Sequence, residues 1–157
     1  MNLAYAAAFP AVAIALCAAY DRQARRAGMF GLLAFGTAMI GTCSLGADMW
    51  FEGFAAPWLA EVVPDVLTAE KTAIWRAGFL SSFTFFSLGW ILCGLASLHA
   101  RVYPRSLSLA VVAGGLIGIK AASPPYGVPL ALALLALGLW MLTSRNAVQV
   151  TASPITR

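Results

Sequence analysis

The stretch that decides the fold is Met29–Met49, MFGLLAFGTAMIGTCSLGADM. It carries a single charged side chain, Asp48, and it is long enough to cross a bilayer as a helix, which takes about 20 apolar residues. Glycines recur along it, and they allow a neighbouring helix to approach its backbone closely. These glycines are Gly31, Gly36, Gly41 and Gly46. We therefore expect a transmembrane helix with a packing face of small residues.

The rest of the chain follows the same pattern of long apolar blocks. Of its 157 residues, 61% are hydrophobic and only 10% are charged, whereas a soluble domain has about 25% charged residues. The expected membrane spans are 3–20, 29–49, 72–98, 106–120 and 128–143. The sequence thus predicts an all-α integral membrane protein, a single bundle of five transmembrane helices over residues 1–143. A polar cytoplasmic tail, expected to be disordered, follows over residues 144–157.

The first span has to be distinguished from a cleaved signal peptide. A secretory signal carries positive charge before its apolar core, whereas here the basic link 21–26 follows the apolar segment. That order favours an uncleaved helix, and cleavage would leave four spans instead of five.

The distribution of basic residues predicts the orientation, because cytoplasmic loops collect Lys and Arg. With the N-terminus outside, seven basic residues fall on the inner side and three on the outer side. The inner ones are Arg22, Arg25, Arg26, Arg101, Arg105, Arg145 and Arg157, and the outer ones are Lys71, Arg76 and Lys120. We therefore predict a multi-pass protein of the cell membrane with its C-terminus in the cytoplasm. Because the basic residues lie at helix ends and form no single patch, we expect no nucleic-acid partner.

The long polar connection between the second and third spans, 50–71, is expected to form a short interfacial helix or hairpin on the outer surface. Aromatic residues of the kind that settle at the headgroup level lie along it. This interfacial aromatic belt consists of Trp50, Phe51, Phe54 and Trp58.

Four charged residues form the candidate ligand or ion cluster. Asp48 and Glu52 lie one helical turn apart, so a continuous helix would place both carboxylates on one face. Arg76 and Lys120 fall at the same expected membrane level, at the ends of the third and fourth spans. Two alternatives stay open: solvated side chains that pin the helix ends in the headgroup zone, and ion pairs between subunits.

No catalytic constellation emerges from the sequence. The sole histidine, His99, cannot build a metal site alone and suits the C-terminal end of a helix. Ser81, Thr84 and Ser87 are three residues apart and predict a polar stripe that faces the bundle interior, without a base to activate any of them. The cysteines lie inside apolar blocks and are expected to be packing residues; they are Cys17, Cys43 and Cys93. We therefore expect a non-enzymatic protein without a metal site or cofactor.

Several short motifs carry a resemblance to a known group of proteins. The run Asp48–Pro57 contains FE-x-F-x-x-P. Further motifs are Leu88-Gly89-Trp90, Cys93-Gly94-Leu95, Arg101-Val102-Tyr103-Pro104-Arg105, Gly114-Gly115 and Leu137-Gly138-Leu139-Trp140. The chain resembles small uncharacterised multi-pass membrane proteins that are common in actinobacteria. The resemblance implies a bacterial membrane protein with a designed outer segment, and it supplies no activity to carry over.

Two functions remain open at this point. The first is an accessory or partner-binding membrane protein that acts through helix faces rich in small residues, with a second copy or another protein as its partner besides the lipid bilayer. The alternative is a protein for small-molecule, lipid or proton-coupled binding or transport that uses the acidic residues of the charged cluster.

Overall fold

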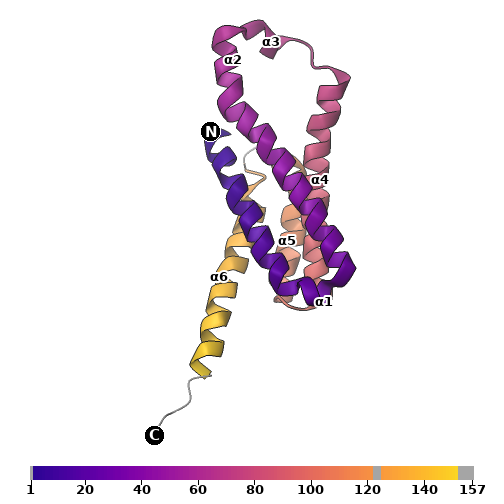
Figure 1. The fold of residues 1–157 in the computed structure, drawn as a ribbon, viewed down its shortest axis with the longest axis vertical. Helices are drawn as coiled ribbons and strands as arrows, with labels where there is room; N and C mark the ends of the chain where they lie inside the picture. Colours follow the sequence, from indigo (N-terminus) through magenta and orange to yellow (C-terminus); the bar gives the residue numbers. More distant parts are fainter. Residues whose placement is uncertain (1, 122–124, 152–157) are drawn as a thin grey trace.

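A computed structural model of the chain describes residues 2–121 and 125–151, and these residues form helices without any strand (Figure 1). The elements in chain order are α1 (Asn2–Trp50), the π-helical turn η1 (Phe51–Ala55), α2 (Ala56–Val62), α3 (Pro64–Thr68), α4 (Ala73–Ala100), α5 (Arg105–Ile117), the 3₁₀ turn η2 (Gly118–Lys120) and α6 (Val128–Thr151). The expected all-α fold class is confirmed.

The longest element, α1, consists of two helical rods that meet at Gly28. This residue has φ 56° and ψ −146°, and the chain reverses its direction there (Figure 1). Glycine adopts a positive φ readily because it lacks a Cβ atom. The basic link 21–26 is therefore helical, and the first rod runs on through it to the bend.

The second rod of α1 packs against α4 in the most extensive contact between elements. A Cβ atom on Gly41 would collide with the backbone of Phe85 and Phe86, and one on Gly89 would collide with the backbone of Ala38. The two backbones thus meet directly, as the glycines of Met29–Met49 predict for Gly41. Gly36, in contrast, has no atom near its Cβ position.

Glycines also allow α5 to pack closely against α4 and α6. A Cβ atom on Gly115 would lie 2.7 Å from the backbone nitrogen of Ile91 in α4. One on Gly114 would lie 2.7 Å from the Cα atom of Leu130 in α6. The core that these contacts enclose is centred on Trp90, which is 1% exposed.

We call the end of the bundle that holds Gly28 and Arg101 the base, and side-chain hydrogen bonds join separate helices there. The Ser97 hydroxyl donates to Gln23 Oε1 at 2.8 Å, and both side chains are buried. The Tyr103 hydroxyl donates to the Ala19 carbonyl at 2.7 Å. Arg22 donates to the Met141 carbonyl at 3.2 Å, which ties α1 to α6.

The expected spans agree with the helices in part. Two helical stretches, Ala6–Val62 and Ala73–Ala100, are long and apolar enough to cross a membrane, and Val128–Ser144 is a shorter apolar helix. The expected fourth span is divided between α5 and η2. Helix α6 continues past residue 143 to Thr151, so the tail begins as helix, and its last part, residues 152–157, lies outside the described residues.

The expected polar stripe on α4 is wrong. Ser81 and Thr84 are exposed and donate to carbonyls of their own helix, whereas Ser87 is buried and donates to the Gly115 carbonyl of α5 at 2.7 Å. Six residues of a helix with 3.6 residues per turn place Ser81 and Ser87 about 120° apart, so they cannot share a face.

The cysteines agree with their expected packing role only in part. Cys93 is buried in the core, while Cys17 and Cys43 are exposed on α1.

Candidate functional site

The end of the molecule opposite the base, which we call the head, comprises residues 48–79. Here α1 continues through η1 into α2, the short α3 crosses over, and the chain returns into α4 (Figure 1). Thr72 caps α4 by accepting the Trp75 backbone N–H at 3.2 Å. The expected short helix of the 50–71 connection is thus present as α2 and α3.

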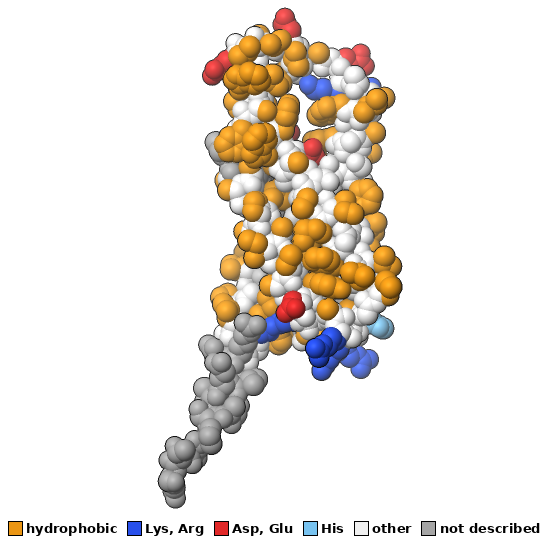
Figure 2. All heavy atoms as spheres, in the orientation of Figure 1, with side chains coloured by type: hydrophobic (Ala, Val, Ile, Leu, Met, Phe, Trp, Pro, Cys, Tyr) orange, Lys and Arg blue, Asp and Glu red, His pale blue; other side chains and the backbone are white. Residues whose placement is uncertain are grey.

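A groove of about 760 Å³ lies between the two arms of the head (Figure 2). Its walls consist of Ala47, Asp48, Phe51, Glu52, Ala56, Leu67, Lys71, Ile74, Trp75, Gly78 and Phe79. We call this the head groove. Its volume is within the range of about 300–1,000 Å³ that is usual for small-molecule sites, and its walls are mostly apolar with a few charged groups.

The head groove brings together the two acidic residues of the predicted cluster. Asp48 lies in the last turn of α1 and Glu52 in η1, and both line the groove. The Ser82 hydroxyl of α4 donates to the Gly78 carbonyl of its own helix at 3.2 Å. The Oδ2 atom of Asp48 is buried and has no hydrogen-bond partner in the part of the chain that the structure describes.

The π-helical turn that carries Glu52 is itself unusual. Single π-helical turns are rare in proteins, and many of those that occur lie at functional sites. In the head, the turn joins α1 to α2 and carries Phe51 as well as Glu52 to the groove wall. Nothing in the spacing of apolar residues distinguishes such a turn from an ordinary helix, so the sequence did not predict it.

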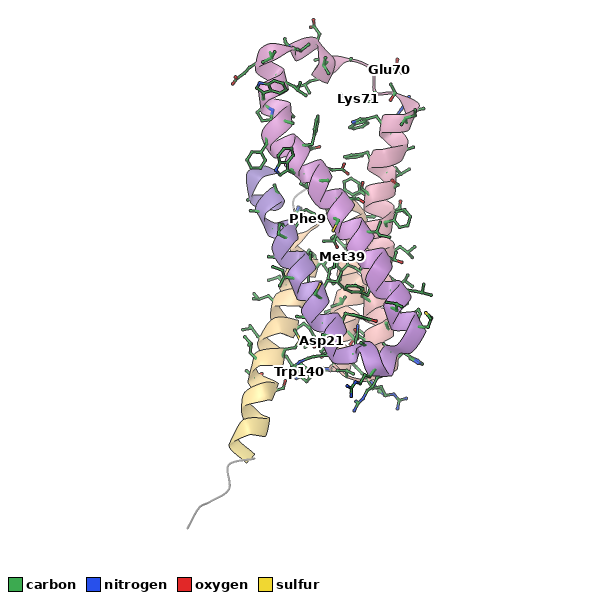
Figure 3. The ribbon with its side chains drawn as sticks, viewed as in Figure 1. Phe9, Asp21, Met39, Glu70, Lys71 and Trp140 are labelled. Carbon is green, nitrogen blue, oxygen red and sulfur yellow. The ribbon has the colours of Figure 1, made fainter. Side chains whose placement is uncertain are left out.

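Lys71 is the charged groove residue that the sequence analysis left out of the cluster. Its Nζ atom donates to the Leu67 carbonyl at 3.1 Å and lies 5.5 Å from the centre of the Trp75 ring (Figure 3). The chain returns through α3 to bring Lys71 opposite Asp48, although the two are far apart in sequence. The groove thus carries two carboxylates and one ammonium group, and its formal charge is negative.

Arg76 and Lys120 do not belong to the groove, so the predicted four-residue cluster is not brought together. Arg76 lies 3.9 Å from Glu70, and both side chains are largely exposed. Lys120 lies 5.6 Å from the centre of the Tyr126 ring. Lys120 comes two residues after Gly118, which packs on Phe86. Phe86 lies about three helical turns along α4 from Trp75, so Lys120 is distant from the groove. The reason is that α5 is short and ends before it reaches the head.

The aromatic residues of the predicted belt divide into two sets. All four are exposed, but Phe51 lines the head groove, whereas Trp50, Phe54 and Trp58 do not. On the opposite wall, the rings of Trp75 and Phe79 stack at 5.1 Å. Apolar rings therefore face the groove from both arms.

The groove combines acidic and aromatic side chains. In residues 2–121 and 125–151, no group of three His, Cys, Asp or Glu side chains is placed to hold a metal ion. His99 is exposed in the last turn of α4, at the base, far from the groove. Two carboxylates beside aromatic faces are the combination that attracts a cation with an apolar body.

Comparison of the chain with protein-family models, curated proteins and solved structures gives no match. The likeness to the small actinobacterial membrane proteins therefore stays a prediction, and the functional argument depends on the geometry of the head.

Proposed function

We propose that this protein is a multi-pass membrane protein that binds a small organic cation with an apolar body in the head groove. The observation that carries the proposal is the pair Asp48 and Glu52 in one groove, which the stacked rings of Trp75 and Phe79 also line.

The membrane placement is supported by the distribution of side chains on the surface. Hydrophobic side chains cover the middle of the molecule, most acidic side chains gather at the head, and a cluster of basic ones lies at the base (Figure 2). Large apolar residues are widely exposed between the two ends, for example Ile14 at 70% and Leu80 at 65%. Exposed apolar surface of this extent is typical of a membrane or protein contact.

Five spans and their orientation follow from that placement. The two rods of α1, together with α4, α5 and α6, would cross the bilayer, with the base arginines in the cytoplasm and the head outside. Helix α5 has 13 residues and is about 20 Å long, less than the roughly 30 Å of a hydrocarbon core. It packs on both α4 and α6, so its ends can be enclosed by protein.

The charge and the walls of the head groove define the class of ligand. Asp48 and Glu52 outnumber Lys71, so the groove attracts a positive group. Trp75, Phe79 and Phe51 offer apolar surface and aromatic faces to the remainder of the ligand. An aryl-alkyl ammonium ion combines both features, and it serves as the chemical probe for this site.

The test is a titration of the purified full chain in nanodiscs with three probes of similar size and different charge. These are 2-phenylethylammonium, neutral 2-phenylethanol and anionic 3-phenylpropionate. We expect the cation to bind at least tenfold more tightly than the neutral probe, and the anion not to bind. The variant Asp48→Asn/Glu52→Gln should lose this preference while its helical circular dichroism stays unchanged. Equal affinities for the three probes would overturn the proposal.

A second candidate function, an accessory or partner-binding subunit, is supported by a glycine of α1 that lies outside the two large grooves. Gly36 has no atom within 4 Å of a Cβ position. Another helix, from a second copy or from another protein, can approach closely at such positions. Purification in mild detergent would then yield a stable complex, whereas a monodisperse monomer would contradict this function.

A further inference from the structure

A second groove runs along the side of the bundle, between the first rod of α1 and α6. These two elements make few contacts with each other, and a space of about 690 Å³ separates them. Its α1 wall is built from alanines one turn apart, Ala8, Ala11, Ala15 and Ala18. Its α6 wall includes Leu135, Gly138 and Leu142. We call this the α1–α6 groove.

The length and the walls of the α1–α6 groove suit a hydrocarbon chain. From Ala8 to Arg22 the groove follows α1 for about 21 Å. Apart from Asp21 and Arg22 at one end, the side chains that line it are apolar.

The end of the groove away from Arg22 is apolar. At Ala8 and Val12 a smaller cavity of about 90 Å³ adjoins it, lined by Phe9, Phe86 and Leu130 among others. A groove of about 21 Å is longer than half of a hydrocarbon core of roughly 30 Å and shorter than the whole. It therefore matches a lipid chain that enters from one leaflet and ends near the middle of the bilayer.

The open end of the groove is charged. Arg22 lines it, and its guanidinium donates to the Met141 carbonyl at 3.2 Å and to the Ser144 hydroxyl at 3.4 Å. A guanidinium has five N–H donors, so others remain for a ligand. Asp21, the only acidic residue at the base, is exposed and also lines this end of the groove (Figure 3). Four more arginines belong to the base, namely Arg25, Arg26, Arg101 and Arg105.

We infer that the α1–α6 groove holds one acyl chain of an anionic phospholipid of the cytoplasmic leaflet, with the lipid phosphate at Arg22. The positive charge of the base favours an anionic headgroup, and anionic lipids give the cytoplasmic leaflet its negative surface potential. This inference rests on the membrane placement proposed above and is independent of cation binding in the head groove.

The experiment is native mass spectrometry of the full chain after reconstitution in equal amounts of phosphatidylglycerol and phosphatidylcholine with identical acyl chains. We expect one retained lipid per chain, with phosphatidylglycerol enriched at least fivefold over phosphatidylcholine. Arg22→Gln should bring that ratio close to one. The control Arg26→Gln removes the same charge from an exposed position outside the groove and should leave the ratio unchanged.

A second pair of variants tests the acyl chain itself. Ala11→Leu/Ala15→Leu fills the groove and should reduce lipid retention at least fivefold, while Ala7→Leu, on the same rod but outside the groove, should not. If the double variant does not fold, as judged by helical circular dichroism, the ratio of the two lipids retained by Arg22→Gln still tests the inference. Equal retention of both lipids by the wild-type chain would overturn the inference, as would lipid-free dimers. Loss of cation binding in the head groove affects neither readout, so the two proposals fail separately.

Discussion

The base and the head of this molecule differ in how closely their helices meet. Below the head, Gly41 and Gly89 bring the middle parts of α1 and α4 into backbone contact, and at the base Ser97 donates to Gln23. Toward the head the same two helices carry Gly46, which faces Phe9 of the first rod, and Gly78, which faces no neighbour. The arms therefore separate where the glycine contacts end, and the head groove opens between them. A closed base thus holds an open binding site in position.

The strongest test of this difference is a pair of glycine substitutions within α4. Gly89→Ala places a methyl group against the backbone of Ala38, so we expect a loss of about 1–3 kcal/mol in the free energy of unfolding. Gly78→Ala meets open space and improves helix propensity, so it should be neutral or stabilising by up to about 1 kcal/mol. Unfolding by sodium dodecyl sulfate in mixed micelles measures both. Equal effects on the free energy of unfolding would mean that Gly89 of α4 does not pack against the backbone of α1.

The buried hydrogen bond at the base comes next. Ser97→Ala removes the donor to Gln23 Oε1 and leaves that oxygen buried, so we expect a loss of about 1–3 kcal/mol in the free energy of unfolding. The control Thr84→Ala removes an exposed hydroxyl that bonds only within α4, and it should change stability by less than about 0.5 kcal/mol. The same unfolding assay compares the two, and a larger loss in the control would contradict the closed base.

Tyr103 gives the base a dependence on pH. Burial raises the pKa of Tyr103 from its usual 10 to about 12, with Arg22 lowering and Asp21 raising it slightly. The unfolded chain ionises first, so the stability that Tyr103 contributes is complete below pH 10 and is lost as the pH rises toward 12. Tyr103→Phe should cost about 1 kcal/mol at pH 7 and flatten the stability profile between pH 10 and 12. An unchanged slope in that variant would show that Tyr103 is not the titrating group.

The smallest effect is expected at the exposed ion pair of the head. Arg76→Gln breaks the contact with Glu70, and both partners are largely solvated, so the free energy of unfolding should change by less than about 0.5 kcal/mol. Arg76 is also absent from the groove walls, so the affinity for 2-phenylethylammonium should not change. A substantial change in that affinity would mean that Arg76 contributes to ligand binding.

The sequence predicted helices and acidic residues better than it predicted partners between distant segments. The turn spacing of Asp48 and Glu52 placed both on one wall, because adjacent turns of continuous helical chain preserve that relation even through the π-helical turn. Lys71 was missed because its approach depends on the path of α3. Arg76 and Lys120 were included because equal depth in a bilayer was taken for proximity, although depth leaves the direction of each side chain undetermined.

Helix ends were predicted less well than helix centres. The basic link 21–26 looked like a loop because it is polar, yet Gly28 is the residue at which the chain turns. The polar tail after residue 143 begins as a continuation of α6. In both cases a polar composition marks where a membrane would end, and the helical backbone hydrogen bonds continue beyond it.

The most direct test of the account is a comparison of two substitutions on opposite walls of the head groove, measured by titration with 2-phenylethylammonium in nanodiscs. Asp48→Asn removes an attractive charge and Lys71→Gln removes a repulsive one, and the double variant Asp48→Asn/Glu52→Gln corrects for partitioning of the probe into lipid. The account predicts opposite signs: Asp48→Asn weakens binding at least tenfold, and Lys71→Gln tightens it about fivefold, or ~1 kcal/mol. Binding that changes in the same direction in both variants, or in neither, would contradict a cation site in this groove.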